Sequence, residues 1–237
     1  MMSFLKTNLV QKIILILLAV SLIFLTLISI NAKHFLALYY VVWIGGVGSL
    51  VWRYRLQLEE VLLSWSIGGF TKFLFLGIVM ILAEETLAGI SMHLAISRDL
   101  HYLLKGILQF WAFNILALPG FIIAWYILLS KFKYTRKEVF ILVGLFGLFA
   151  ESIGLKILGN PIAGMTLVLP TMFTYAIIVA PSVMSFNNSK EGKLLSVFPR
   201  YVLGFILPII ASLPFIGILA ILKNHFPDVF PPAGFVG

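Results

Sequence analysis

The sequence predicts an all-α polytopic membrane protein with about seven transmembrane helices, a cytoplasmic N-terminus and a C-terminus outside the cell. Three observations predict this class. The 237 residues are 61% hydrophobic and only 11% charged, with a mean hydropathy of +1.09, whereas about a quarter of residues are charged in soluble domains. The apolar residues form runs close to the ~20 residues that a helix needs to cross a bilayer. The basic residues lie between these runs, as expected for a polytopic membrane protein.

Seven apolar runs can be delimited, and each is expected to be helical because unpaired backbone groups are too costly in hydrocarbon. The first run is longer than the apolar core of a signal peptide and no clear cleavage site follows it, so we interpret it as an uncleaved first span. Together the runs predict a single integral membrane domain over residues 1–237. The predicted spans are Ile13–Ile30, Phe35–Trp52, Phe73–Leu94, Gly106–Leu129, Val139–Leu158, Gly164–Met184 and Tyr201–Leu222.

The distribution of lysine and arginine predicts the orientation. Twelve of the 17 lie in the connections on one side, and five lie on the other. Because basic residues concentrate on the cytoplasmic side, the richer side is expected to be inside and the protein to be a multi-pass protein of the cell membrane. The richer side holds Lys6, Lys12, Arg53, Arg55, Lys72, Lys131, Lys133, Arg136, Lys137, Lys190, Lys193 and Arg200, and the other holds Lys33, Arg98, Lys105, Lys156 and Lys223.

The connection Arg53–Lys72 on the basic side has apolar positions spaced for a helix lying along the inner membrane surface. Its two acids, Glu59 and Glu60, are expected to form a solvated face. Lys131–Glu138 is a basic loop on the same side.

Composition and motifs argue against several classes of function. The net charge of +8 is scattered between apolar runs, which disfavours nucleic-acid binding. There is no cysteine, and no two histidines stand one helical turn apart, so no metal site is predicted. No cofactor is predicted either, because the glycines have neither the preceding strand nor the following lysine of a phosphate loop. We interpret them as close helix contacts. They are Gly45, Gly46, Gly48, Gly144 and Gly147.

Three carboxylates lie inside predicted spans and are the candidate catalytic residues. Glu84 is about 18 Å along the helix from Lys72, and Glu151 is about 21 Å from Lys137, so both fall deep in a ~30 Å hydrocarbon core. Ionisable groups at that depth tend to pair, to face a cavity or to do chemistry. Glu85 is expected to point about 100° away from Glu84 and therefore to face a different surface. The alternative is that these acids are protonated groups that only join helices.

Other polar residues in neighbouring spans are candidate substrate-binding groups. Lys156 could move outward at the helix end, pair with Glu151 or hold an anionic head group. The Asn160-Pro161 step ends the fifth span and is expected to line a pocket. The remaining candidates are Asn114, Thr171 and Tyr175.

An internal similarity links two helix pairs. With an offset of 67, Glu84 matches Glu151 and Gly77 matches Gly144. A Leu-Pro step also occurs in each following span, at Pro119 and at Pro170. A parallel repeat of helix pairs 73–129 and 139–184 is one interpretation, and chance matching in apolar sequence is the other.

The run Glu151-Ser152-Ile153-Gly154, followed by Pro161-Ile162-Ala163-Gly164 and then by Leu169-Pro170, resembles a pattern of membrane carotenoid hydratases and lycopene cyclases. It covers about twenty residues, and the aromatic segment that those families place after the first proline is absent. The resemblance implies carboxylates that protonate a polyene.

Three functions follow from these observations. The first is an intramembrane acid/base enzyme that acts on a lipid or isoprenoid (carotenoid-type) substrate within the bilayer. The second is a proton- or cation-coupled small-molecule transporter, which the acids and the repeat would both suit. The third is a non-catalytic membrane scaffold.

Overall fold

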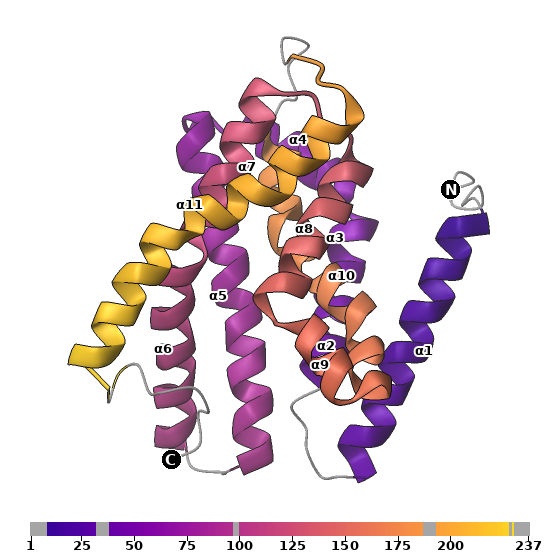
Figure 1. Ribbon diagram of the computed structural model, residues 1–237, viewed down its shortest axis with the longest axis vertical. Coiled ribbons are helices and arrows are strands. Elements are labelled where there is room, and N and C mark those ends of the chain that lie inside the picture. Colours follow the sequence, from indigo (N-terminus) through magenta and orange to yellow (C-terminus); the bar gives the residue numbers. More distant parts are fainter. Residues whose placement is uncertain (1–8, 32–37, 97–99, 187–192, 228, 230–237) are drawn as a thin grey trace.

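The computed structural model describes residues 9–31, 38–96, 100–186, 193–227 and 229 (Figure 1). The described residues contain helices and no β-strand, and the one isolated bridge joins Phe132 to Lys193. The predicted all-α class is therefore confirmed. In chain order the elements are α1 (Leu9–Asn31), α2 (Leu38–Tyr40), the π-helical segment η2 (Val41–Gly48), α3 (Ser49–Arg53), α4 (Arg55–Ser64), α5 (Gly69–Ile96), α6 (Leu100–Ala117), α7 (Pro119–Lys131), α8 (Arg136–Ala150), α9 (Ile153–Gly159), α10 (Pro161–Ser185) and α11 (Val197–His225).

Four of these helices, α1, α5, α10 and α11, are long and apolar enough to cross a membrane. The pairs α6–α7 and α8–α9 meet the same criterion only when each bent pair is taken as one span, which gives up to six spans in the described residues. Helices of this kind suggest a multi-pass membrane protein. The predicted second span consists of α2, η2 and α3, and residues 35–37 of it lie outside the described residues. The count of seven therefore stays a prediction.

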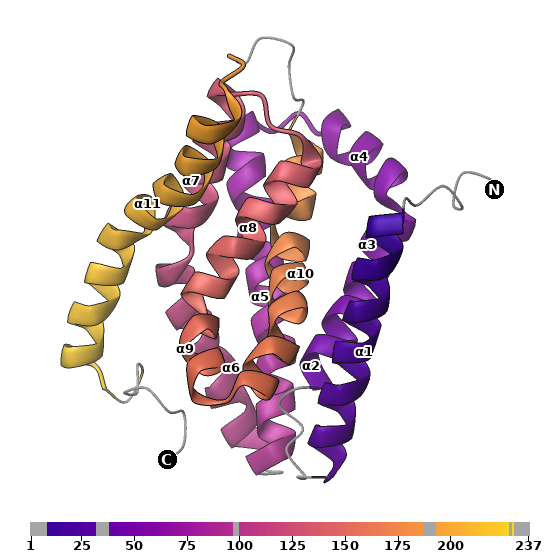
Figure 2. The same ribbon diagram turned by 45° about the vertical axis from the view of Figure 1, so that its right-hand side comes forward.

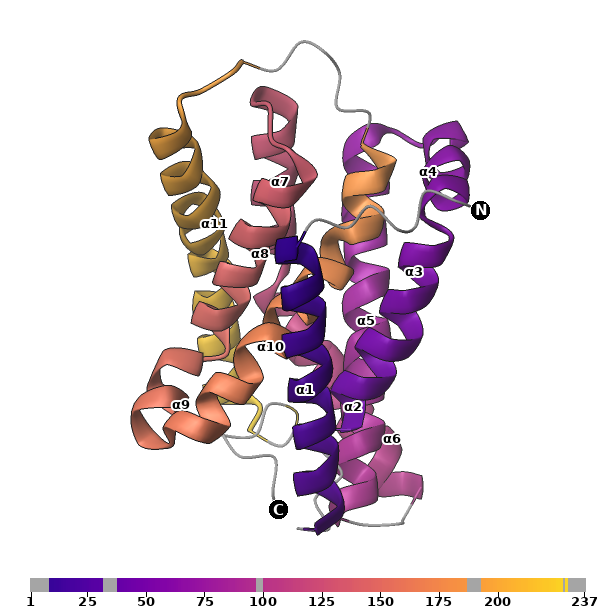
Figure 3. The ribbon, with the colours of Figure 1, turned by 90° about the vertical axis from the view of Figure 1, so that its right-hand side faces the viewer.

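Successive spans run in opposite directions along the long axis of the bundle (Figures 1 and 3). We call the end that carries α4 the basic end, because the loops richest in lysine and arginine lie there. The α7–α8 connection and the start of α11 are at this end as well (Figure 1). α5, α8 and α10 lie inside the bundle, whereas α1 and α11 flank it on opposite sides (Figure 2). Which face of a membrane the basic end meets stays a prediction.

Two of the predicted spans are broken rather than straight. α6 and α7 meet at Leu118 with a bend of 41°, and Pro119 starts α7 at a position where its missing N–H does no harm. α8 and α9 meet at Glu151 and Ser152 with a bend of 57°. Ser152 has φ 52, which is left-handed backbone that a residue with a Cβ rarely adopts. The first bend falls within the predicted span Gly106–Leu129 and the second within Val139–Leu158.

Glycines allow some of these helices to approach closely. A Cβ at Gly48, Gly144 or Gly147 would lie within 3 Å of a side chain of α10, so these three predicted contacts are confirmed. Gly45 and Gly46 were predicted to do the same, but a Cβ at either would meet nothing within 4 Å. They lie in η2, whose wider π-helical turn leaves them facing open space.

Candidate functional site

Glu84 and Glu85 are neighbouring carboxyl residues within α5. The surrounding sequence LAEETL consists mostly of good helix formers, so α5 runs through this point unbroken. Glu84 is only 7% exposed and Glu85 is half-buried. That the two side chains face different surfaces stays a prediction.

Glu151 lies at the break between α8 and α9. Its backbone N–H still bonds to Gly147, and the helix then ends at the left-handed Ser152. As a result the side chain leaves the axis of α8, and Glu151 is exposed on the surface of the bundle. The apolar side chains of Phe149, Leu155 and Leu158 are exposed around the same break. Glu151 therefore lies on an apolar face of the bundle.

Tyr175 reaches Glu151 from α10. Its hydroxyl donates a hydrogen bond of 3.1 Å to Oε1 of Glu151, while the residue itself is only 8% exposed. Its ring fits against Gly147, where a Cβ would lie 2.6 Å from a ring carbon. Phe121 and Phe146 hold the ring with edge-to-face contacts. The tyrosine is thus fixed between the exposed Glu151 and the interior.

Two tyrosines that the sequence analysis did not select complete this region. The rings of Tyr39 and Tyr40 on α2 lie with their centroids 4.1 Å apart. The hydroxyl of Tyr40 is 3.4 Å from Oγ1 of the buried Thr171 on α10. In the sequence, Tyr39 and Tyr40 could have been recognised as two adjacent hydroxyl groups inside an apolar run.

These residues come from four parts of the chain, namely α2, α5, the α8–α9 break and α10. We call them the acid cluster, and it comprises Tyr39, Tyr40, Glu84, Glu85, Glu151, Thr171 and Tyr175. The hydrogen bonds that join members of the cluster are Tyr175–Glu151 and Tyr40–Thr171. Among the described residues no three acids or histidines are close enough together to hold a metal ion.

The other predicted binding residues have local roles. Asn160 is the N-cap of α10 and accepts a hydrogen bond of 3.2 Å from the N–H of Ala163, which explains it without a ligand. Asn114 donates to the carbonyl oxygen of Phe110 within α6. Lys156 is exposed on α9. Of the three alternatives for Lys156, pairing with Glu151 is not observed, since the ion pairs found in the described residues are Arg136–Glu59 and Arg200–Glu138.

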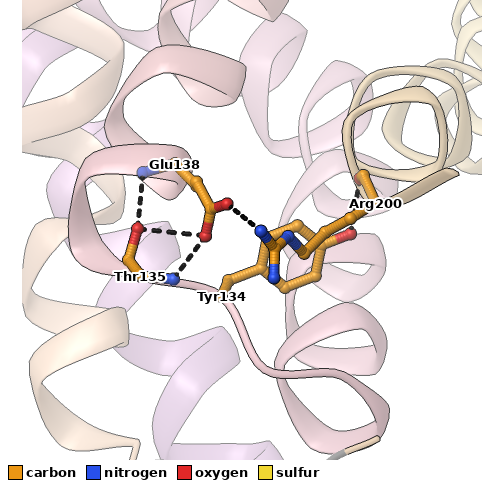
Figure 4. Close-up of polar contacts among 4 residues, drawn as sticks. All are labelled: Tyr134, Thr135, Glu138 and Arg200. Carbon is orange, nitrogen blue, oxygen red and sulfur yellow. Dashed lines mark hydrogen bonds and ion pairs between the residues drawn. The ribbon is translucent and has the colours of Figure 1, made fainter. Parts of the chain in front are cut away.

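A different buried carboxylate, Glu138 at the basic end, shows what a structural acid looks like in this protein (Figure 4). It is the third residue of α8 and forms a capping box with Thr135. Its Oε2 accepts hydrogen bonds from the backbone N–H of Thr135 at 2.8 Å and from the Thr135 hydroxyl at 3.0 Å. Its Oε1 pairs with Arg200 of α11 at 2.5 Å. Both of its oxygens are thus occupied.

Tyr134 ties the same region together. Its hydroxyl donates to the carbonyl oxygen of Arg200 at 2.9 Å, so α11 is held to the α7–α8 connection by backbone as well as side chain (Figure 4). Burial raises the pKa of Tyr134 to about 12, with Glu138 adding to the rise and Arg200 opposing it. The sequence analysis treated this stretch only as a basic loop, although the spacing Thr135-x-x-Glu138 was a readable capping signal.

Charged groups at the basic end are paired in other ways too. The buried ammonium group of Lys72 donates to the carbonyl oxygens of Leu62 and Trp65, at 2.8 and 3.0 Å, and so closes the C-terminal end of α4. Glu59 pairs with Arg136 rather than being only solvated as predicted, whereas Glu60 is exposed as predicted. A small pocket of about 200 Å³ lies beside this pair, lined by Glu59, Leu63, Leu129, Tyr134, Arg136, Val139, Val183 and Phe186.

Comparisons with protein-family models, with curated proteins and with solved structures find no match. The resemblance of residues 151–170 to carotenoid hydratases and lycopene cyclases therefore stays a prediction.

Proposed function

We propose that the protein is an intramembrane acid/base enzyme of the cell membrane, and that it acts on a lipid or isoprenoid (carotenoid-type) substrate. Glu84 and Glu85 supply and recover the proton. One observation carries the proposal: within the described residues no lysine or arginine forms an ion pair with either carboxyl of this buried pair. A buried acid that only joins helices is expected to have its oxygens occupied, as those of Glu138 are. Two neighbouring carboxyl groups in an apolar site are suited to general acid/base catalysis.

The surroundings favour an apolar substrate. The surface beside Glu151 carries Phe149, Leu155 and Leu158, and Leu158 is 81% exposed. In a bilayer such a surface faces lipid chains. A substrate dissolved in the bilayer would reach the acid cluster from this side without crossing water, and it would contact Glu151 first.

A second candidate function is a proton-coupled transporter, and one observation favours it. Gly77 on α5 is the point where Ile122 of α7 packs, and Gly144 on α8 is the point where Met172 of α10 packs. Ile122 lies three residues after Pro119, and Met172 lies two residues after Pro170. The two contacts lie at similar places in the two helix pairs, which supports the proposed repeat, and repeats of this kind are common in transporters.

The test compares lipid and pigment extracts from cells that lack the protein with extracts from cells that carry it. Restoring wild type is expected to change the extract, and Glu84→Gln is expected to reduce the product on the order of 10²–10⁴-fold, because a general acid contributes about that much. Glu60→Gln, at an exposed acid of α4, is the matched control and is expected to behave as wild type. A Glu84→Gln protein that restores the full wild-type extract contradicts the proposal. Proton-driven uptake into vesicles with an unchanged extract supports the transporter.

A further inference from the structure

Two segments at the basic end are joined by backbone hydrogen bonds. The N–H of Lys193 donates to the carbonyl oxygen of Lys131 at 2.9 Å, and the N–H of Lys133 donates to the carbonyl oxygen of Lys193 at 3.3 Å. The hydrogen bond from Tyr134 to Arg200 joins the same two segments a second time (Figure 4). The end of α7 and the chain just before α11 are therefore held side by side.

This pairing brings three lysines together. Lys131, Lys133 and Lys193 are all exposed, and we call them the lysine trio. The two ion pairs found in the described residues involve none of the three. Like charges on paired backbone segments repel each other. An anion bound between the lysines would relieve this repulsion.

Exposed apolar side chains follow the trio along the chain, at Leu194, Val197 and Phe198. Val197 is the first residue of α11, which is long and apolar enough to cross a membrane, and Lys131 is the last residue of α7. In a bilayer, basic groups at the ends of spans lie at the depth of the lipid head groups. A phospholipid can contact both the lysines and the apolar side chains, whereas a free phosphate ion can contact only the lysines.

We propose that the lysine trio binds the head group of an anionic phospholipid of the surrounding membrane. The three ammonium groups hold the phosphate, and the acyl chains lie along the start of α11. Because the backbone hydrogen bonds already fix the two segments, little conformational freedom is lost on binding. The site does not depend on the proposed enzyme function, and it uses none of the residues of the acid cluster.

The test measures thermal unfolding of the full-length protein in micelles of a neutral detergent at increasing concentrations of a probe. Phosphatidylglycerol is the anionic lipid, phosphatidylcholine is the lipid without net charge, and glycerol phosphate carries the phosphate without acyl chains. Wild type is expected to be stabilised most by phosphatidylglycerol, because a ligand that binds only the folded state raises its stability. The effect is expected to weaken at about 1 M salt, where charges are screened within about 3 Å.

Replacing the whole trio tests the site directly. The variant Lys131→Gln, Lys133→Gln, Lys193→Gln is expected to bind phosphatidylglycerol on the order of 100-fold more weakly, since each lysine near an anionic lipid surface contributes about fivefold in affinity. The corresponding variant with three arginines keeps the charge and is expected to bind like wild type. If the glutamine variant does not fold, Lys133→Gln alone is expected to weaken binding about fivefold.

The matched control removes the same number of charges away from the basic end, on α6, on α9 and near the end of α11 (Figure 1). It is the variant Lys105→Gln, Lys156→Gln, Lys223→Gln, and it is expected to bind phosphatidylglycerol like wild type.

Equal affinity for phosphatidylglycerol in wild type and in the glutamine variant overturns the site, as does equal weakening in the glutamine variant and in the control. An arginine variant that binds no better than the glutamine variant overturns it too. Stabilisation of wild type by phosphatidylcholine or by glycerol phosphate as strong as that by phosphatidylglycerol overturns an anionic lipid as the occupant.

Discussion

Glu138 and Glu84 are both buried carboxylates of the same bundle, at 8% and 7% exposure, yet their surroundings are opposite. Glu138 has a backbone N–H, a hydroxyl and a guanidinium group on its two oxygens. Glu84 has a second acid, Glu85. The first arrangement cancels the charge and joins two segments of chain, the start of α8 and α11. In the second, no described lysine or arginine forms an ion pair with either carboxyl. Burial alone therefore does not distinguish a structural acid from a candidate catalytic one.

Removing the charge of Glu138 gives the largest expected effect on stability. Glu138→Gln leaves Arg200 without its partner in a site where both side chains are nearly buried, so the free energy of unfolding is expected to fall by about 3 kcal/mol or more. Thermal unfolding in detergent micelles measures this. The control is Glu59→Gln, which breaks an ion pair whose arginine is 60% exposed and is expected to lower stability by about 1 kcal/mol at most. Equal losses of unfolding free energy in the two variants would contradict the structural role assigned to the Glu138–Arg200 ion pair.

The acid cluster is expected to be sensitive to packing around Tyr175. In Gly147→Ala the new methyl group would lie 2.6 Å from the tyrosine ring, and overpacking of this kind costs about 1–3 kcal/mol. The ring must shift, so the midpoint of thermal unfolding in detergent micelles is expected to fall. Gly154→Ala is the control, because a Cβ there meets nothing within 4 Å. If Gly147→Ala unfolds at the same temperature as Gly154→Ala, the tyrosine is not held as described.

The smallest expected effect is at the α8–α9 break. Ser152→Gly replaces a residue held at φ 52 with one that adopts this conformation freely, and stability is expected to rise by about 1 kcal/mol in thermal unfolding. Ser64→Gly, at the last residue of α4, is the control and is expected to lower stability slightly. A loss of stability in Ser152→Gly would mean that the serine side chain has a role at the break.

The sequence predicted the helical class and the positions of the apolar helices, because hydropathy is a property of each run by itself. It also selected Glu84, Glu151, Thr171 and Tyr175, because polar groups inside apolar runs are conspicuous. The break at Glu151 could not be predicted in this way, since no glycine or proline marks the backbone reversal at Ser152. The contribution of Tyr39 and Tyr40 depends on α2 lying against α5 and α10, which is a tertiary contact.

At Asn160 the sequence analysis predicted a binding role, whereas the structure shows a local role as a helix N-cap. An asparagine followed by a proline was interpreted as part of a pocket, although the same pair is a common start of a helix, with the asparagine as N-cap and the proline in the first turn.

The most direct test of the difference between the two acids is the thermal unfolding of Glu84→Gln measured beside Glu138→Gln in the same micelles. Glutamine keeps the size of glutamate, and no described lysine or arginine loses a partner. Glu84→Gln is therefore expected to unfold within about 1 kcal/mol of wild type or to be more stable, as substitutions at active sites often are, while Glu138→Gln is clearly destabilised. A loss of stability in Glu84→Gln as large as that in Glu138→Gln would show that the buried pair serves the fold and would contradict the proposed catalytic role.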